Sequence, residues 1–181
     1  MGRNHRRRRA TESQADMLSE EELHELTLQT FAGSALFKRI FDDGMKLVEE
    51  TAGYLDGPGR EEQRRLPQTI ALLYAGESMR VTTRLMQVAS WLLVQRAVHD
   101  GEMKAEEAAG ERYRLGSKEI CLGMGRVGVE HLPKDLQGLL ARSDTLYRQI
   151  SRLDEVLFGT VAIAPGAREQ IQMLEQAFGA R

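Results

Sequence analysis

The longest run of regularly spaced apolar residues extends from Pro67 to about His99. Only four residues within it carry charge: Glu77, Arg80, Arg84 and Arg96. On a helix with about 100° per residue, the apolar residues form two adjacent lines. The first line comprises Leu72, Ala75, Met79, Thr82, Met86, Ala89 and Leu93, and the second comprises Ile70, Tyr74, Val81, Leu85, Val88 and Leu92. Together they span roughly 200°, wider than the ~100° stripe of a surface helix. We therefore predict a central helix that is covered on two sides, either by two other helices or by one helix and a partner chain.

A second amphipathic pattern covers residues 34–55 and predicts a long helix capped by Ser34. Its apolar half comprises Phe37, Ile40, Phe41, Gly44, Leu47, Val48, Thr51 and Leu55. Gly44 lies in this stripe although glycine costs up to ~1 kcal/mol in a helix, which indicates a close helix crossing. Residues 56–59 are expected to end the helix, because glycine can take the left-handed position and proline cannot continue the turn. The short charged connector over residues 60–65 then predicts an antiparallel hairpin with the central helix.

A third apolar pattern predicts a helix from about Lys134 to Phe158. Its main strip comprises Leu139, Leu146, Ile150, Leu153 and Leu157. Before it, residues 102–115 have the composition of a marginal exposed helix, and residues 116–133 have the glycine content of a loop. We therefore predict an all-α fold: an antiparallel three-helix bundle with a long central helix, a flexible N-terminal arm, a mobile loop before the third helix and a C-terminal tail.

Three regions follow from these patterns. Residues 1–18 read as a disordered basic arm, residues 19–159 as the helical bundle domain, and residues 160–181 as a flexible tail. The tail contains a short amphipathic strip: Ile171, Leu174 and Phe178. Two helical turns are too short to be stable alone, so we predict that this strip docks on a partner. The alternative is that it folds back onto its own bundle.

The composition is typical of a soluble globular protein, with 41% hydrophobic and 29% charged residues among 181. The net charge of −2 gives no overall attraction to nucleic acids or acidic membranes. The single cysteine, Cys121, excludes an intrachain disulfide and a cysteine-based zinc cluster, as is typical of a reducing cytosol. The charges within the central helix argue against a membrane span, and the polar residues after the arginine run argue against a signal peptide. We expect a cytoplasmic protein.

Two motifs have the letters of known sites but lack their context. The run from Gly123 to Gly128 matches a dinucleotide fingerprint, yet no strand precedes it and Pro133 soon follows. Glu21 and His24 have the spacing of a di-iron ligand pair, yet the sequence holds no second pair of this kind. We also find no Ser/His/Asp or Cys/His arrangement. We therefore expect no cofactor, no metal ion and no catalytic site.

Four consecutive arginines occupy residues 6–9 and are able to bind phosphates by charge alone. No aromatic residues are interleaved with them, so a solvated arm is the favoured interpretation. A nucleic-acid-associated regulator that uses this arm is the alternative function. A steep loss of nucleic-acid affinity with salt would favour that alternative.

The minor face of the central helix carries a mixed polar patch. Its members are Glu77, Arg80, Arg84, Gln87 and Trp91. Arginine and tryptophan are enriched at interaction hot spots, so we predict an exposed partner-binding surface here. The equally weighted alternative is local packing, with the arginine stems lying on the indole of Trp91 and paired with Glu77.

Two stretches resemble the alphaproteobacterial RcdA family, which is named for regulation of CtrA degradation. They are residues 48–60, Val-Glu-Glu-Thr-Ala-Gly-Tyr-Leu-Asp-Gly-Pro-Gly-Arg, and residues 74–93, Tyr-Ala-Gly-Glu-Ser-Met-Arg-Val-Thr-Thr-Arg-Leu-Met-Gln-Val-Ala-Ser-Trp-Leu-Leu. The similarity extends over about residues 31–160, and the second stretch is the more specific. The resemblance implies a three-helix bundle that pairs as a homodimer.

The resemblance also implies a non-catalytic function. Members of the family are adaptors of the ClpXP protease, to which they help deliver cell-cycle proteins together with a response regulator. For this chain, the implied partners are therefore ClpX or ClpXP, a response regulator and a protein cargo. The arginine run and the glycine-rich residues 123–128 are not part of the family pattern.

Overall fold

The computed structural model describes residues 20–123 and 128–158, and within them it contains helices and connecting turns only. This confirms the all-α prediction. The elements are α2 (Glu20–Ala32), α3 (Ala35–Asp56), α4 (Pro58–Arg65), α5 (Gln68–His99), α6 (Ala105–Ala108), η1 (Glu111–Tyr113), α7 (Lys118–Leu122), η2 (Val129–His131) and α8 (Lys134–Phe158). The three long helices predicted from the sequence correspond to α3, α5 and α8.

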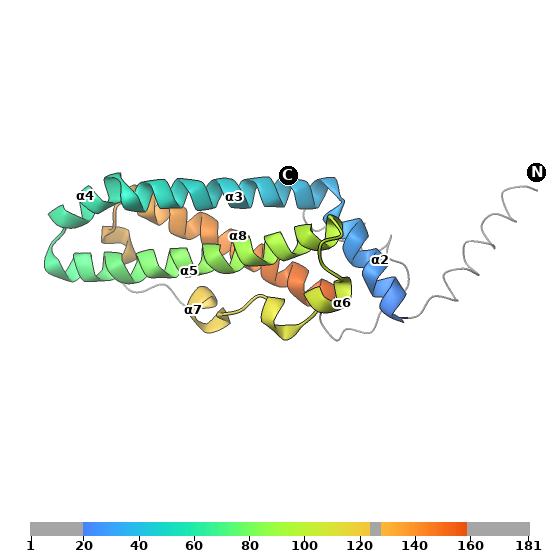
Figure 1. Ribbon diagram of the computed structural model, residues 1–181. Coiled ribbons are helices and arrows are strands. Elements are labelled where there is room, and N and C mark those ends of the chain that lie inside the picture. The colour runs from blue at the N-terminus through green and yellow to red at the C-terminus, as the bar shows by residue number, and fades with distance from the viewer. Residues whose placement is uncertain (1–19, 124–127, 159–181) are drawn as a thin grey trace, which may run out of the picture.

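These three helices lie side by side and form the bundle (Figure 1). α3 and α5 form the predicted antiparallel hairpin, joined at one end of the bundle by α4. α8 runs in the same direction as α5, because residues 100–133 first return along the bundle; Arg84 of α5 pairs with Asp144 of α8, and further along Trp91 pairs with Asp154. α2 crosses the other end, where the ring of Phe31 lies 6.3 Å from that of Trp91.

Local signals account for the ends of α3. The side chain of Ser34 accepts a hydrogen bond from the backbone amide of Phe37 at 3.1 Å, as expected for an N-cap. The connector after α3 is itself helical, which the sequence analysis did not predict. Pro58 suits the first turn of α4, and Arg64 and Arg65 oppose the negative end of its dipole. Gly57 keeps a negative φ of −110°, so the expected left-handed glycine is not used here.

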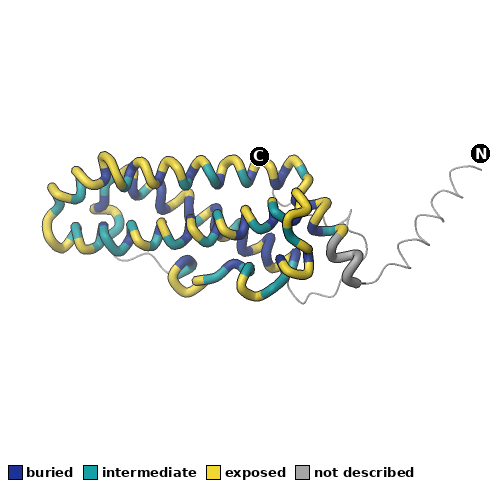
Figure 2. Tube along the Cα trace, in the orientation of Figure 1, coloured by how far each residue is buried: buried dark blue, intermediate teal, exposed yellow. Residues whose placement is uncertain are grey.

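The core lies between the three long helices, as the dark inner edges of the tube show (Figure 2). All five residues of the predicted α8 strip are buried. Gly44 marks the predicted close crossing, because a Cβ added there would lie 2.9 Å from Cδ1 of Leu92. Both predictions are confirmed.

Within a single chain, only the second of the two apolar lines of α5 is covered, so cover by other helices of the chain is wrong for the first line, while cover by a partner chain stays a prediction. In the second line Tyr74, Val81, Leu85, Val88 and Leu92 are buried. The large residues of the first line are exposed: Leu72 by 71%, Met79 by 72%, Met86 by 64% and Leu93 by 53%. The cause is that the elements packed against α5, chiefly α8, α3 and α2, cover its second apolar line and its polar side but leave the first line open. No described helix is both long enough and apolar enough to cross a membrane.

Candidate protein-interaction site

The polar patch predicted to be exposed on α5 is buried. Glu77, Arg84 and Trp91 are only 2%, 5% and 1% exposed, and Arg80 is partly buried. The placement of these residues on a free surface is therefore wrong. The sequence could not reveal this, because the groups that cover and satisfy them lie 37 to 63 residues further along the chain.

The cover is a segment that we call the strap, residues 111–123, which contains η1 and α7. Three side chains of the α5 patch form hydrogen bonds to the backbone of the strap, and the strap runs antiparallel to α5 past them. Gln87 accepts from the amide of Gly116 at 3.0 Å, Arg84 Nε donates to the carbonyl of Cys121 at 2.7 Å, and Arg80 Nη1 donates to the carbonyl of Gly123 at 2.8 Å. The patch is thus an interaction surface within the molecule, with the strap as its partner.

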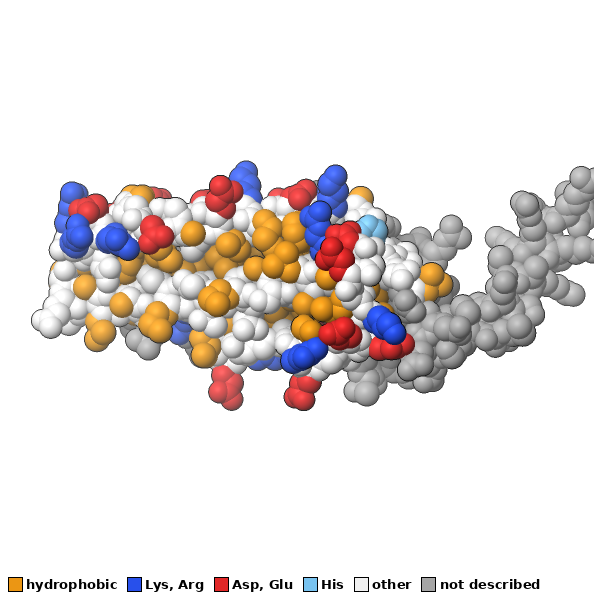
Figure 3. Space-filling view, in the orientation of Figure 1, with side chains coloured by type: hydrophobic (Ala, Val, Ile, Leu, Met, Phe, Trp, Pro, Cys, Tyr) orange, Lys and Arg blue, Asp and Glu red, His pale blue; other side chains and the backbone are white. Residues whose placement is uncertain are grey.

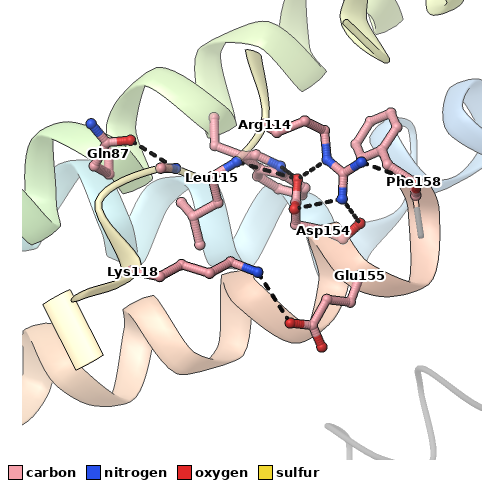
Figure 4. A network of polar contacts seen from close by, with 9 residues as sticks. Gln87, Arg114, Leu115, Lys118, Asp154, Glu155 and Phe158 are labelled. Atoms are coloured by element: carbon pink, nitrogen blue, oxygen red, sulfur yellow. Dashed lines mark hydrogen bonds and ion pairs between the residues drawn. The ribbon is translucent and has the colours of Figure 1, made fainter. Parts of the chain in front are cut away.

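The first part of the strap is fixed by Asp154, a buried carboxylate on α8 (Figure 4). Nε and Nη2 of Arg114 both donate to this carboxylate at 2.9 Å, and the amide of Leu115 donates at 3.4 Å. The indole Nε1 of Trp91 donates to the same carboxylate at 2.9 Å. Arg114 also donates to the backbone carbonyl of Phe158 at 3.0 Å, which ties the strap to the end of α8. Such a charged, hydrogen-bonded network is strong when every member is satisfied.

Charges beneath the second part of the strap are less completely satisfied. Burial lowers the pKa of Arg84, and this guanidinium pairs with Asp144 at 3.0 Å. Glu77 pairs with Arg80 at 3.4 Å through Oε2, while its Oε1 has no hydrogen-bond partner within the described part of the chain. Burial raises the pKa of the Cys121 thiol, so this thiol stays protonated and unreactive. An imperfectly paired buried carboxylate is costly.

The opposite side of α5 is a candidate surface for a second protein, and we call it the outer face. It comprises Leu72, Ala75, Gly76, Met79, Thr82, Thr83, Met86, Ala89, Ser90 and Leu93. None of these residues is charged, and at 1.5 Å per residue the face is about 30 Å long. Hydrophobic side chains are visible along this side of the bundle (Figure 3). On α3, Phe41, Met45 and Val48 are also apolar and only partly buried, and they pack against the core. A patch of this kind is typical of interaction sites.

The sizes of the side chains along the outer face are nearly symmetric about its midpoint. Around the midpoint between Thr82 and Thr83, Met79 mirrors Met86 and Leu72 mirrors Leu93. The smaller positions mirror one another too: Ala75 with Ser90, and Gly76 with Ala89. A two-fold dimer brings the same patch of each subunit together, so an antiparallel pair of such helices would place like against like along the whole face. The heptad spacing of the large residues was the signal in the sequence, and it predicted a covered line without indicating whether other helices or a partner chain cover it.

Grooves elsewhere on the bundle have a different character. Two of about 550 and 560 Å³ lie between α3 and α8 and share Glu50 and Arg142, which form an exposed ion pair at 2.6 Å.

In residues 20–123 and 128–158, no group of three or more metal-ligating side chains is close enough to hold a metal ion. The tail residues expected to bind a partner, Ile171, Leu174 and Phe178, lie outside the described residues, as do the N-terminal arm and most of the glycine-rich motif.

The described helices define an all-α bundle built on one long central helix. A protein-family comparison matches residues 28–178 to a family described as "Protein of unknown function (DUF1465)". Among solved structures, the chain is similar to RcdA from Caulobacter crescentus CB15, at 51% sequence identity and a TM-score of 0.59, over 72% of this chain and 97% of that one. The chain belongs to the RcdA family, which confirms the resemblance seen in the sequence. A comparison with curated proteins found no match.

Proposed function

We propose that this chain is a non-catalytic adaptor in regulated protein degradation that works as a homodimer joined through the outer face of α5. The observation that carries the proposal is 51% identity over 97% of the RcdA chain. From the family resemblance, the proposed partners are the ClpXP protease, a response regulator and cell-cycle regulators as cargo, in the cytoplasm. The chain would bring these proteins together without changing any of them chemically.

The outer face supports the homodimer in two ways. Its mirrored sequence fits a two-fold antiparallel pairing, which a second copy supplies and an unrelated helix does not. Its size is also appropriate. Eight large side chains, four from each copy, contribute roughly 8–16 kcal/mol at about 1–2 kcal/mol each for the area still exposed. Association costs about 4–15 kcal/mol, so we propose a dimer of moderate affinity that exchanges with monomer on dilution.

Partner contacts are assigned to other parts of the chain. Glu77, Arg84 and Trp91 are covered by the strap and by α8, so we no longer propose them as contacts for the protease or cargo. Ile171, Leu174 and Phe178 remain our proposed contact for delivery, because an apolar strip of two turns gains structure when it docks in a groove. A chain truncated after Gly159 should then keep its melting temperature but lose delivery.

Reconstituted degradation tests the proposal. Purified ClpXP, ATP, a CtrA-type cargo and the response regulator are combined, and the cargo half-life is measured with and without this chain. We expect faster loss of cargo when the chain is present, with the chain itself remaining intact. An unchanged half-life at saturating concentrations of every component would contradict the proposal. Tight nucleic-acid binding that falls steeply with salt would instead support the alternative function of the arginine arm.

A further inference from the structure

We infer that α7 is a hinged plug: residues 117–123 swing away from the bundle as a unit while the rest of the strap stays fixed. Opening uncovers a buried cluster made of Glu77, Arg80, Arg84 and the Cys121 thiol. This inference goes beyond the proposed adaptor function, and it concerns the isolated chain. Three features of the strap carry it: a fixed anchor, a strained hinge and a weakly held plug.

The anchor ends at Gly116. Its amide donates to Gln87 at 3.0 Å, and its carbonyl accepts from the hydroxyl of Tyr147 at 2.6 Å. Immediately before it, Leu115 is buried and Arg114 is bound to Asp154 through two nitrogens. With both backbone groups of Gly116 held by side chains from α5 and α8, the chain up to this residue moves only if the bundle itself opens.

The hinge is Ser117. It is the only non-glycine residue with positive φ in the described part of the chain, with φ 57° and ψ 32°. Left-handed backbone is unfavourable for any residue with a Cβ, and strain of this kind persists only where surrounding contacts impose it. Ser117 is exposed, so no side-chain packing holds it in this conformation. The closed position of α7 imposes the strain, and opening would relieve it.

The plug itself is weakly held. Of residues 117–123 only Cys121 is buried, and Ile120, the large apolar residue of α7, is 55% exposed. Leu122 is partly buried and packs against the core, and the Cys121 thiol shares a hydrogen bond with Tyr147. The other contacts are to backbone carbonyls, from Arg84 to Cys121 and from Arg80 to Gly123, together with an exposed ion pair from Lys118 to Glu155 at 3.3 Å. Segments with few buried apolar contacts are those that open locally at low free energy.

The surface of α5 beneath the plug is poorly suited to keeping the plug closed permanently. In the closed form the guanidinium of Arg84 is buried and bonded to the plug, and the nearby carboxylate of Glu77 is buried with one oxygen unpaired. The Arg84 guanidinium regains water when the plug opens, which offsets part of the lost hydrogen bonding. The closed and open forms are therefore closer in free energy than the folded and unfolded bundle.

Cys121 reports on the plug, since it is the single cysteine of the sequence and is fully buried when α7 is closed. We propose measuring the rate at which 4,4′-dithiodipyridine modifies it in the full chain, across denaturant concentrations below the unfolding transition. Local opening predicts modification at least about 100-fold faster than global unfolding allows, with little dependence on denaturant because little surface is exposed. A rate that follows global unfolding at every concentration would overturn the inference.

A matched pair of variants tests the hinge. Ser117→Pro fixes φ near −65°, which the closed turn does not accept, whereas Ser117→Ala keeps the left-handed position available. We expect Ser117→Pro to raise the modification rate at least about tenfold and to lower the free energy of unfolding only by the equivalent amount, about 1.4 kcal/mol per tenfold, whereas Ser117→Ala should behave like the original chain. An unchanged rate in Ser117→Pro would overturn the hinge, and so would a loss in free energy of unfolding much larger than the rate increase accounts for, since the plug would then be an integral part of the fold. Failure here leaves the degradation assay unaffected.

Discussion

The two faces of α5 are opposite in composition and opposite in exposure. The inner polar face carries Glu77, Arg84 and Trp91 and is almost fully covered, while the outer face carries Met79 and Met86 and is bare. An ordinary surface helix buries its apolar side and exposes its charges. The difference shows that residue type alone does not decide which face of α5 is buried. A charged residue is buried where distant groups of the chain form hydrogen bonds and ion pairs with it.

Removing the Asp154 carboxylate, which binds residues of the inner face and the strap, should have the largest effect on the free energy of unfolding. Asp154→Ala leaves Arg114 and the indole of Trp91 without their shared acceptor. We expect the free energy of unfolding to fall by about 2–4 kcal/mol, less than the 3–5 typical of a fully buried pair because the Arg114 side chain is 27% exposed. Denaturant titration followed by circular dichroism measures the change.

The neighbouring residue provides the control. Glu155 forms only an exposed pair with Lys118, so Glu155→Ala should change the free energy of unfolding by less than about 0.5 kcal/mol. Equal losses from Asp154→Ala and Glu155→Ala would show that the network around Asp154 does not hold the inner face.

The packing of the buried side predicts an intermediate effect. Gly44→Ala places a methyl group 2.9 Å from the side chain of Leu92, and we expect a loss of about 1–3 kcal/mol. Gly53→Ala is the matched control on the same helix, because an added Cβ there meets nothing within 4 Å. It should instead stabilise the protein by about 0.5–1 kcal/mol through helix propensity. Thermal unfolding of both variants compares them directly, and a stabilised Gly44→Ala would contradict the close crossing.

The outer face should contribute least to the stability of a single chain. Met79→Gln exchanges one exposed, helix-compatible side chain for another, so at concentrations too low for pairing we expect a change within about 0.5 kcal/mol. Unfolding measured at submicromolar concentration tests this. A loss of 2 kcal/mol or more would mean that Met79 is packed in the core of the single chain after all.

The sequence was sufficient for the long helices because caps and apolar periods are local. Ser34, Gly44 and the span of α8 were all predicted correctly. It was not sufficient for the faces of α5, where apolar residues extend too far round the helix to indicate which line is buried. That choice depends on Asp154 and on the strap backbone, whose proximity to α5 is a property of the tertiary fold. The helical connector α4 was missed because its sequence, Pro-Gly-Arg-Glu-Glu-Gln-Arg-Arg, has no spaced apolar residues that would indicate a helix.

The mass of the protein in solution tests the central claim most directly. Light scattering or sedimentation equilibrium at tens of micromolar should give about twice the chain mass of 20.4 kDa. The double variant Met79→Asp with Met86→Asp should give one chain mass with unchanged helical content, because a two-fold seam places four carboxylates together. Ala141→Asp, on the exposed surface of α8, is the control and should remain a dimer. A monomeric original chain, or a double variant that stays dimeric, would contradict the assignment of the outer face as the seam.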